Sequence, residues 1–336
     1  MNLLFHVYNI SGYLMAEISE LLARDVEIGI IETPCSLSGK AHEMFPQIHW
    51  FDSIAKCDFK PDVFFCGGWA DKEALGFAKE LHKNSCVTVL LIDTPWQGLF
   101  KQYIHCMISR FYLTHIFDYA WGAGEPQAKY LRRLGFSKDR IKTGYYSADT
   151  KKFAALYDES RVTLPHKFLY VGRYVAVKNM RLMERAFIKA IEKMPQSDWE
   201  LVCIGCGELW DERTIHPRIS HNGYISPIEI QDHLKGAGVF VLPSLYEPWG
   251  VVVHEFAAMG LPLLCSEKVQ AATAYLQKGK NGYQFDPMDE ESLVDAFCKI
   301  MELPDSRLVE MGKCSHELGM SYTTSDWASK ALSFWR

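Results

Sequence analysis

Residues 244–260 read SLYEPWGVVVHEFAAMG, a stretch that places carboxylates at both ends of an apolar run. Glu247 and Glu255 stand eight positions apart, around a Pro-Trp-Gly turn and three consecutive valines. Burying an unpaired carboxylate costs several kcal/mol, and a plain core segment needs no such group. We therefore expect polar groups to meet both side chains.

A helix that begins at this turn would bring both glutamates to one site. If residues 240–244 form a strand and 245–250 its loop, then residues 251–260 form a helix whose first-turn amides lie beside Glu247. The valines alone favour a strand, so this interpretation competes with local propensity. A carboxylate accepts two hydrogen bonds, and we expect Glu247 and Glu255 to meet hydroxyl groups.

Short apolar runs alternate with helical patterns over nearly the whole chain. The runs at 2–10, 61–68 and 85–94 are apolar almost throughout, which is typical of parallel strands covered on both faces. Residues 71–83, DKEALGFAKELHK, carry the spacing of an amphipathic helix. A second series of the same kind begins near residue 167. We therefore predict an α/β fold of two doubly wound, Rossmann-like domains.

The polar stretch 145–167 has no strong periodicity and marks the join between the two domains. We place the N-terminal domain at 1–152 and the C-terminal domain at 153–318. The tail SYTTSDWASKALSFWR predicts one last helix within 319–336, with Ser325 or Asp326 as its N-cap.

Composition excludes several classes of protein. The 336 residues are 48% apolar and 13% aromatic, enough to fill two cores. A net charge of −5 argues against a nucleic-acid partner. No charge-free apolar stretch reaches membrane-spanning length, and the opening MNLLFHVYNISGYLMAEI lacks the features of a secretory signal. The ten cysteines are scattered singly, which is typical of reduced thiols and predicts a cytoplasmic protein.

Two cations stand where the strand that starts the second series ends. Gly172 and Arg173 close that strand, and Lys178 follows just before a predicted helix near Met180. Arginine offers a bidentate fork and lysine a point charge, a pair that suits a diphosphate at a helix N-terminus. Taken alone, such a pair is also compatible with ordinary surface charges.

The common nucleotide and metal motifs are missing. The first strand is followed by a loop in which Gly12 is the only glycine, so the three-glycine dinucleotide fingerprint is absent. There is no G-x-x-x-x-G-K-[ST] phosphate loop. No Asp-x-Asp pair or His/Cys cluster has metal-ligand spacing. We therefore predict neither a metal nor a bound cofactor.

The segment EPWGVVVHE resembles the E-x7-E motif of retaining GT-B glycosyltransferases, in particular glycosyltransferase family 4. The similarity extends over about residues 168–300 and includes YVGRYVAVKN, GCGE, HNGYIS and KNGYQFDPMDEESLVDAF, in family order. It implies two domains that face each other across a cleft. It also implies a metal-independent hexosyltransferase that moves a sugar from a nucleoside-diphosphate sugar to an acceptor hydroxyl, with retention at the anomeric carbon.

The resemblance implies a role for each matching residue. Arg173 and Lys178 would hold the donor diphosphate, and Glu255 the ribose. The catalytic residues would be Arg173, Lys178 and Glu247. The donor-binding residues would be Gly12, Gly172, Arg173, Lys178, Tyr224, Glu247, Trp249, Gly250, Val251 and Glu255, with Tyr224 near the base. The family's last helix commonly packs back on the first domain, a role that suits residues 319–336.

The N-terminal half matches the family less well. Ser11-Gly12-Tyr13 stands where members often have a two-glycine loop, and Asp93 where many carry a histidine. Members with EPWG loops resemble bacterial enzymes that build capsule, lipopolysaccharide or exopolysaccharide. The resemblance implies a glycan or lipid-linked acceptor and peripheral contact with the inner membrane. A sugar-nucleotide epimerase of the same fold, and a non-catalytic sugar-nucleotide-binding partner, are the alternatives.

Residues 96–117, WQGLFKQYIHCMISRFYLTHIF, form a long apolar segment that includes Lys101, His105, Arg110 and His115. We predict a buried helix with a polar edge. The alternative is a helix that lines a lipid-facing or acceptor groove. Basic residues follow the segment, and they suit either a solvated face or anionic headgroups.

Overall fold

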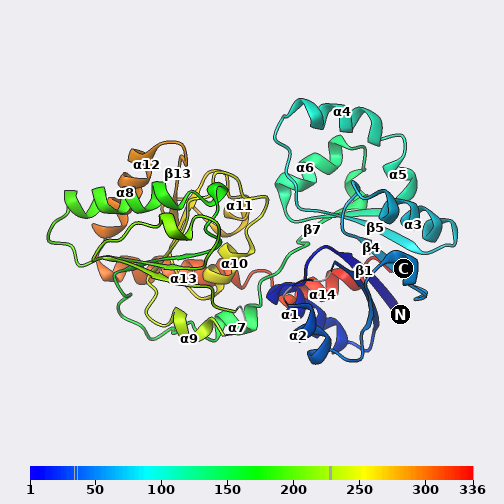
Figure 1. Ribbon diagram of the computed structural model, residues 1–336, viewed down its shortest axis with the longest axis horizontal. Coiled ribbons are helices and arrows are strands. Elements are labelled where there is room, and N and C mark those ends of the chain that lie inside the picture. Colours follow the sequence, from blue (N-terminus) through cyan, green and yellow to red (C-terminus); the bar gives the residue numbers. More distant parts are fainter. Residues whose placement is uncertain (34, 36, 227–228, 336) are drawn as a thin grey trace. The chain divides into compact units, whose positions relative to one another are not determined.

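The computed structural model describes residues 1–33, 35, 37–226 and 229–335, and the chain divides into two compact units (Figure 1). Unit 1 comprises Met1–Asp149 and Thr323–Arg336, and unit 2 comprises Thr150–Tyr322. These divisions lie a few residues from the predicted boundaries at 152 and 318. The C-terminal segment belongs to the same unit as the N-terminal half.

Unit 1 is built on a seven-stranded parallel sheet with the order β3-β2-β1-β4-β5-β6-β7. The strands are β1 (Asn2–Val7), β2 (Glu27–Glu32), β3 (His49–Phe51), β4 (Val63–Cys66), β5 (Val87–Ile92), β6 (Tyr119–Gly122) and β7 (Ile141–Thr143). The strands in the middle of the sheet are buried along almost their whole length, which confirms the prediction of a sheet covered on both faces.

The helices of unit 1 are α1 (Gly12–Leu22), α2 (Ser38–Met44), α3 (Lys72–Lys83), α4 (Phe100–Ser109), α5 (Leu113–Ile116), α6 (Glu125–Arg133) and α14 (Thr324–Leu332). The helix predicted over 71–83 is confirmed as α3, and the Asp71 carboxylate caps it by accepting hydrogen bonds from Glu73 N and Ala74 N. The Ser11 hydroxyl caps α1 by accepting from Leu14 N at 3.2 Å.

The N-cap of α14 is Thr323, so the predictions of Ser325 or Asp326 were wrong. The Thr323 hydroxyl accepts a hydrogen bond from Asp326 N at 3.2 Å. The Asp326 carboxylate reaches back to Thr323 N at 2.8 Å, which completes a capping box. Asp326 therefore acts from the third helical position rather than from the cap itself.

The segment 96–117 is not a buried helix with a polar edge, so that prediction was wrong. It forms the two helices α4 and α5, and α4 buries polar side chains. Gln102 is 6% exposed, and its amide donates to Pro95 O at 2.9 Å and accepts from Gln97 N at 2.8 Å. These bonds fix the preceding loop to the polar side of α4, so the apolar side is turned outward.

Unit 2 contains a six-stranded parallel sheet with the order β10-β9-β8-β11-β12-β13. The strands are β8 (Lys167–Val171), β9 (Glu200–Ile204), β10 (Ile219–Asn222), β11 (Val239–Leu242), β12 (Leu263–Ser266) and β13 (Gly282–Phe285). Its helices are α7 (Thr150–Ala154), α8 (Met180–Lys193), α9 (Gln231–Leu234), α10 (Val251–Ala258), α11 (Ala272–Tyr275), α12 (Glu290–Met301) and α13 (Asp305–Gly319).

The three valines that follow Gly250 are helical, as the site prediction required. Gly250 adopts the left-handed conformation at φ 96°, which a residue with a side chain rarely adopts, and α10 begins directly after it. Val253 and Phe256 are fully buried. Tertiary burial of one face therefore outweighs the local preference of valine for a strand.

His254 anchors α10 inside unit 2. Its side chain is completely buried, its ring stacks on Tyr275 at 4.1 Å between centroids, and its Nε2 lies 2.7 Å from Gly319 O. Burial lowers the pKa of His254 to about 4. The imidazole is therefore neutral in the folded protein over the physiological pH range.

The free energy of unfolding is expected to fall as the pH falls through the titration of this histidine. Below the ordinary pKa of about 6.5 the unfolded chain binds a proton that the folded chain excludes, so acid favours unfolding. We expect a loss of roughly 1 kcal/mol between about pH 7.5 and about pH 5.5, relative to the His254→Gln variant. Urea denaturation of both proteins across this range measures the difference, and parallel pH profiles would contradict it.

Candidate functional site

Each sheet has one position where the order of the strands reverses. In open α/β sheets, ligands bind outside the carboxyl ends of the strands at such a switch point. In unit 2 the switch lies between β8 and β11, which are neighbours in the sheet although two strands separate them in sequence. The loops that leave these two strands, residues 172–179 and 243–250, carry the residues singled out above.

The loop after β8 is held by close backbone contacts with the loop after β9. Gly172 N donates to Ile204 O at 3.0 Å. Gly205 lies at φ 138°, and a Cβ there would stand 1.9 Å from Gly172 O, so only glycine fits. Tyr170 Oη donates to Arg173 O at 2.9 Å. The backbone that carries the exposed Arg173 is therefore fixed.

Lys178 forms an ion pair with Glu247. The two side chains come from the two loops at the switch point and are only 15% and 14% exposed. Ser244 Oγ donates to the same carboxylate at 3.4 Å, and Leu245 N donates to Val177 O at 2.8 Å, which joins the loops. The polar partner expected for Glu247 is thus a lysine.

The EPWG loop is fixed on its other side by residues 268–271. Glu247 N donates to Lys268 O at 3.2 Å, and Trp249 O accepts from Ala271 N at 2.9 Å. A Cβ on Gly250 would lie 2.9 Å from Glu247 Cγ, so the turn is as tight as its sequence suggests. The amides of the first turn of α10 therefore begin at the switch point, with the positive end of the helix dipole.

The structure brings together some of the predicted site residues. Lys178 and Glu247 meet at the β8–β11 switch point, where α10 starts at Val251, and Arg173 lies in the same loop as Lys178. Glu255 lies one turn further along α10 and is half-buried.

Two other predicted donor-binding residues, Tyr224 and Gly12, lie elsewhere, while Trp249 stands in the EPWG loop itself. Tyr224 follows the edge strand β10 and is 62% exposed. The Trp249 side chain is buried, and its Nε1 has no hydrogen-bond partner among the described residues. Gly12 is the first residue of α1 and belongs to unit 1. In the part of the chain that the structure describes, no three His, Cys, Asp or Glu side chains are grouped to hold a metal ion.

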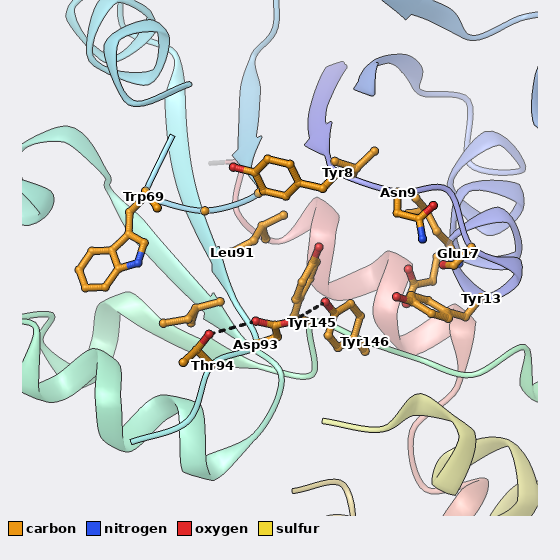
Figure 2. A pocket seen from close by; sticks show the side chains of 17 residues that line it. Tyr8, Asn9, Tyr13, Glu17, Trp69, Leu91, Asp93, Thr94, Tyr145 and Tyr146 are labelled. Atoms are coloured by element: carbon orange, nitrogen blue, oxygen red, sulfur yellow. Dashed lines mark hydrogen bonds between the residues drawn. The ribbon is translucent and has the colours of Figure 1, made fainter. Parts of the chain in front are cut away.

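A pocket of about 450 Å³ opens in unit 1 at the other switch point, where β1 and β4 are neighbours (Figure 2). It is formed by the residues that follow β1, β4 and β5 and by the first turns of α1. The side chains labelled in Figure 2 are those of Tyr8, Asn9, Tyr13, Glu17, Trp69, Leu91, Asp93, Thr94, Tyr145 and Tyr146. Five of these ten are aromatic, and they surround polar groups.

Two carboxylates line this pocket in different environments. Glu17 is buried, accepts a hydrogen bond from Ser147 N at 2.7 Å, and has its pKa raised well above the usual range by burial. Asp93 lies between Thr94 and Tyr146, and the hydroxyl of each donates to it at 3.4 Å (Figure 2). One carboxylate is thus part of the core, while the other borders the space that a ligand would fill.

Sequence reasoning missed Tyr145, Tyr146 and Glu17 in this site. The two tyrosines were assigned to the polar join between domains, because their stretch has no periodicity. The available signal was their position directly after β7, since residues that follow a strand of a parallel sheet lie at its carboxyl edge. Glu17 carried a weaker signal, a charge on the apolar side of α1.

The family of Glycosyl transferases group 1 matches residues 165–302 of this chain. Over these residues the chain is similar to a group 1 glycosyltransferase domain. The matched residues, called the group 1 domain below, contain β8 to α12 and both loops of the Lys178–Glu247 site.

Other proteins are similar to part of this chain in sequence. An uncharacterized glycosyltransferase of Methanocaldococcus jannaschii is 27% identical over 132 residues, which is 37% of this chain and 33% of that protein. The mannosylfructose-phosphate synthase of Agrobacterium fabrum is 26% identical over 175 residues, which is 46% of this chain and 37% of that protein. The matched region spans about a third of the length of these relatives.

Solved structures resemble the whole chain in fold. A glycosyltransferase from Rickettsia africae has a TM-score of 0.74 at 13% identity, over 99% of this chain and 97% of that one. Anabaena HepE in complex with UDP-glucose has a TM-score of 0.73 at 11% identity, over 99% and 98% of the two chains. The fold is therefore GT-B, with a doubly wound parallel sheet in each unit.

Proposed function

We propose that this chain is a metal-independent, retaining glycosyltransferase that moves a sugar from a nucleoside-diphosphate sugar to an acceptor hydroxyl. The observation that carries the proposal is the ion pair of Lys178 and Glu247, which stands with Arg173 and the start of α10 at the switch point of the group 1 domain. A neighbour in fold was solved with UDP-glucose, which supports a nucleotide-sugar donor.

The donor diphosphate would replace Glu247 as the partner of Lys178. When the C1–O bond breaks toward an oxocarbenium-like state, negative charge builds up on the leaving diphosphate. Arg173, Lys178 and the first amides of α10 stabilise that charge because they are already oriented. Glu247, released from the lysine, then accepts a hydrogen bond from a hydroxyl of the transferred sugar.

The pocket of unit 1 would hold the acceptor. Aromatic rings offer flat apolar faces to the C–H groups of a sugar ring, while Asn9, Asp93 and Thr94 offer polar atoms to its hydroxyls. We therefore propose a glycan or lipid-linked glycan as acceptor, in the synthesis of a bacterial surface polysaccharide such as capsule, lipopolysaccharide or exopolysaccharide. The proposal includes a cytoplasmic protein with peripheral contact at the inner membrane.

A screen of nucleoside-diphosphate sugars by thermal unfolding tests the proposal. A ligand at 100 times its dissociation constant adds about 2.7 kcal/mol to the free energy of unfolding, a clear rise in Tm. The stabilising donor is then incubated with glycan acceptors, and NMR of the product reads the anomeric configuration. A donor that binds but whose sugar is transferred to none of the acceptors, even if the donor is hydrolysed, would contradict the proposal. A product with an inverted anomeric configuration would also contradict it.

Glu255→Ala is expected to weaken nucleotide binding by about tenfold or more, because a carboxylate that accepts hydrogen bonds from a ribose contributes about 1.5–3 kcal/mol. Isothermal titration of UDP into the variant and the parent protein measures the change. Glu159→Ala, at an exposed position of the same unit, is the matched control and should bind UDP as the parent does. Equal affinity in all three proteins would remove the ribose role of Glu255.

A further inference from the structure

The apolar residues of α4 lie on its exposed face. Phe100, Ile104 and Met107 follow the i, i+4, i+7 spacing that normally marks the buried side of a helix, and Phe111 lies in the turn directly after α4. Here they are 80%, 37%, 64% and 74% exposed. Large apolar side chains gathered on one exposed face mark an interaction surface.

The opposite face of α4 is polar and holds the helix in this orientation. Gln102 and Ser109 are 6% and 1% exposed, and the Gln102 amide bonds the loop before the helix. Trp96 in that loop packs edge-on against Tyr103 at 4.9 Å between ring centroids. The guanidinium of Arg133, a residue of α6, lies over the Trp96 ring, 4.3 Å from the ring centroid. Turning the apolar face inward would break these contacts.

The charged side chains of the segment that contains α4 are all of one sign. No Asp or Glu occurs between Asp93 and Asp118. Lys101 and Arg110 flank the apolar face of α4 and are exposed, and Arg133 is exposed on the neighbouring helix. The chain as a whole has a net charge of −5, so this local excess of positive charge is not a general property of its surface.

We propose that the outer face of α4 docks the protein on a bilayer surface that contains anionic lipids. A helix that lies in the interface buries its apolar face among the acyl chains, while its cationic flanks contact phosphate groups. A second copy of this chain suits the surface less well, because it would bring like charges together. No helix in the described residues is long and apolar enough to cross a bilayer, and this mode of contact requires none.

This inference rests on the membrane contact named in the proposed function, but its test does not depend on sugar transfer. The full chain is sedimented with vesicles of phosphatidylcholine alone, and with vesicles that also contain phosphatidylglycerol. We expect binding to the anionic vesicles, reduced by salt. Phe100→Ser/Met107→Ser/Phe111→Ser should lower the partition coefficient by at least about tenfold. Lys101→Glu/Arg110→Glu should lower it by about tenfold or more for anionic vesicles only.

The control is Ile215→Ser/Met288→Ser, which removes two apolar side chains that are 81% and 76% exposed in unit 2. It should bind vesicles like the parent protein, and circular dichroism should show the same unfolding for all variants. UDP titration on the same proteins reports the donor site separately, so vesicle binding without any sugar transfer would support this inference while refuting the proposed function.

Three results would overturn the inference. The first is a parent protein that does not sediment with anionic vesicles. The second is equal binding to neutral vesicles, which would remove the role of the cations. The third would be found by analytical ultracentrifugation: the parent protein self-associates, and the Phe100→Ser/Met107→Ser/Phe111→Ser variant does not, while both bind vesicles equally.

Discussion

Replacing Lys178 with alanine is expected to lower the rate of sugar transfer by about 10²–10³-fold while the protein stays folded. Lys178 is 15% exposed, and its ammonium is already paired with Glu247 in the loop that follows β8. A preorganised charge in a partly desolvated site stabilises the leaving diphosphate without reorganisation during the reaction. Arg173→Ala should act in the same direction, because its backbone is fixed at the same switch point. Initial rates with the donor found by thermal screening measure both effects.

Lys167→Ala is the matched control for this experiment. Lys167 stands at the opposite end of β8, pairs with Glu200 at 3.1 Å and is 44% exposed, so its loss should leave transfer unchanged. Circular dichroism of each variant checks the fold. Normal transfer by a folded Lys178→Ala or Arg173→Ala protein would remove these residues from the mechanism.

Replacing Trp327 with alanine is expected to destabilise unit 1 by about 3–5 kcal/mol. The side chain is completely buried, and its ring packs against Phe5 at 6.1 Å and Trp121 at 5.3 Å between centroids. Its Nε1 donates to Tyr145 O at 2.6 Å, next to the pocket. The truncation therefore leaves a cavity and an unpaired carbonyl in the core that joins α14 to the sheet.

Guanidinium denaturation followed by fluorescence measures this loss. Trp335→Ala is the control, since that side chain is 43% exposed and its removal should change the free energy of unfolding only slightly. If Trp327→Ala unfolds at the same denaturant concentration as the parent protein, then α14 does not contribute to the stability of unit 1 in the way described.

The sequence was sufficient to predict the two parallel sheets and the placement of Arg173, Lys178 and Glu247 in loops that follow strands of one sheet. Apolar runs without alternation require a sheet covered on both faces, and parallel strands all end at the same edge. The pairing of Lys178 with Glu247 could not be predicted, because the two residues are 69 positions apart and no local pattern connects them. The helical state of the valines after Gly250 was uncertain for a related reason, since tertiary burial decided it.

The sequence was insufficient for two features of unit 1. The spacing of Phe100, Ile104 and Met107 correctly indicates that they share a helix face, but periodicity does not say whether that face is covered. The hydrogen bonds of Gln102 decide the orientation of α4, and they are a property of the folded loop. Tyr145 and Tyr146 were missed because a pocket is formed by chain segments that only the sheet topology brings together.

A crystal structure with a nucleoside diphosphate soaked into the protein tests the central claim most directly. The account predicts that the two phosphates bind between the Arg173 guanidinium, the Lys178 ammonium and the backbone at Gly250, with Glu247 separated from the lysine. Phosphates bound at any other place on the chain, with the Lys178–Glu247 pair intact, would contradict it.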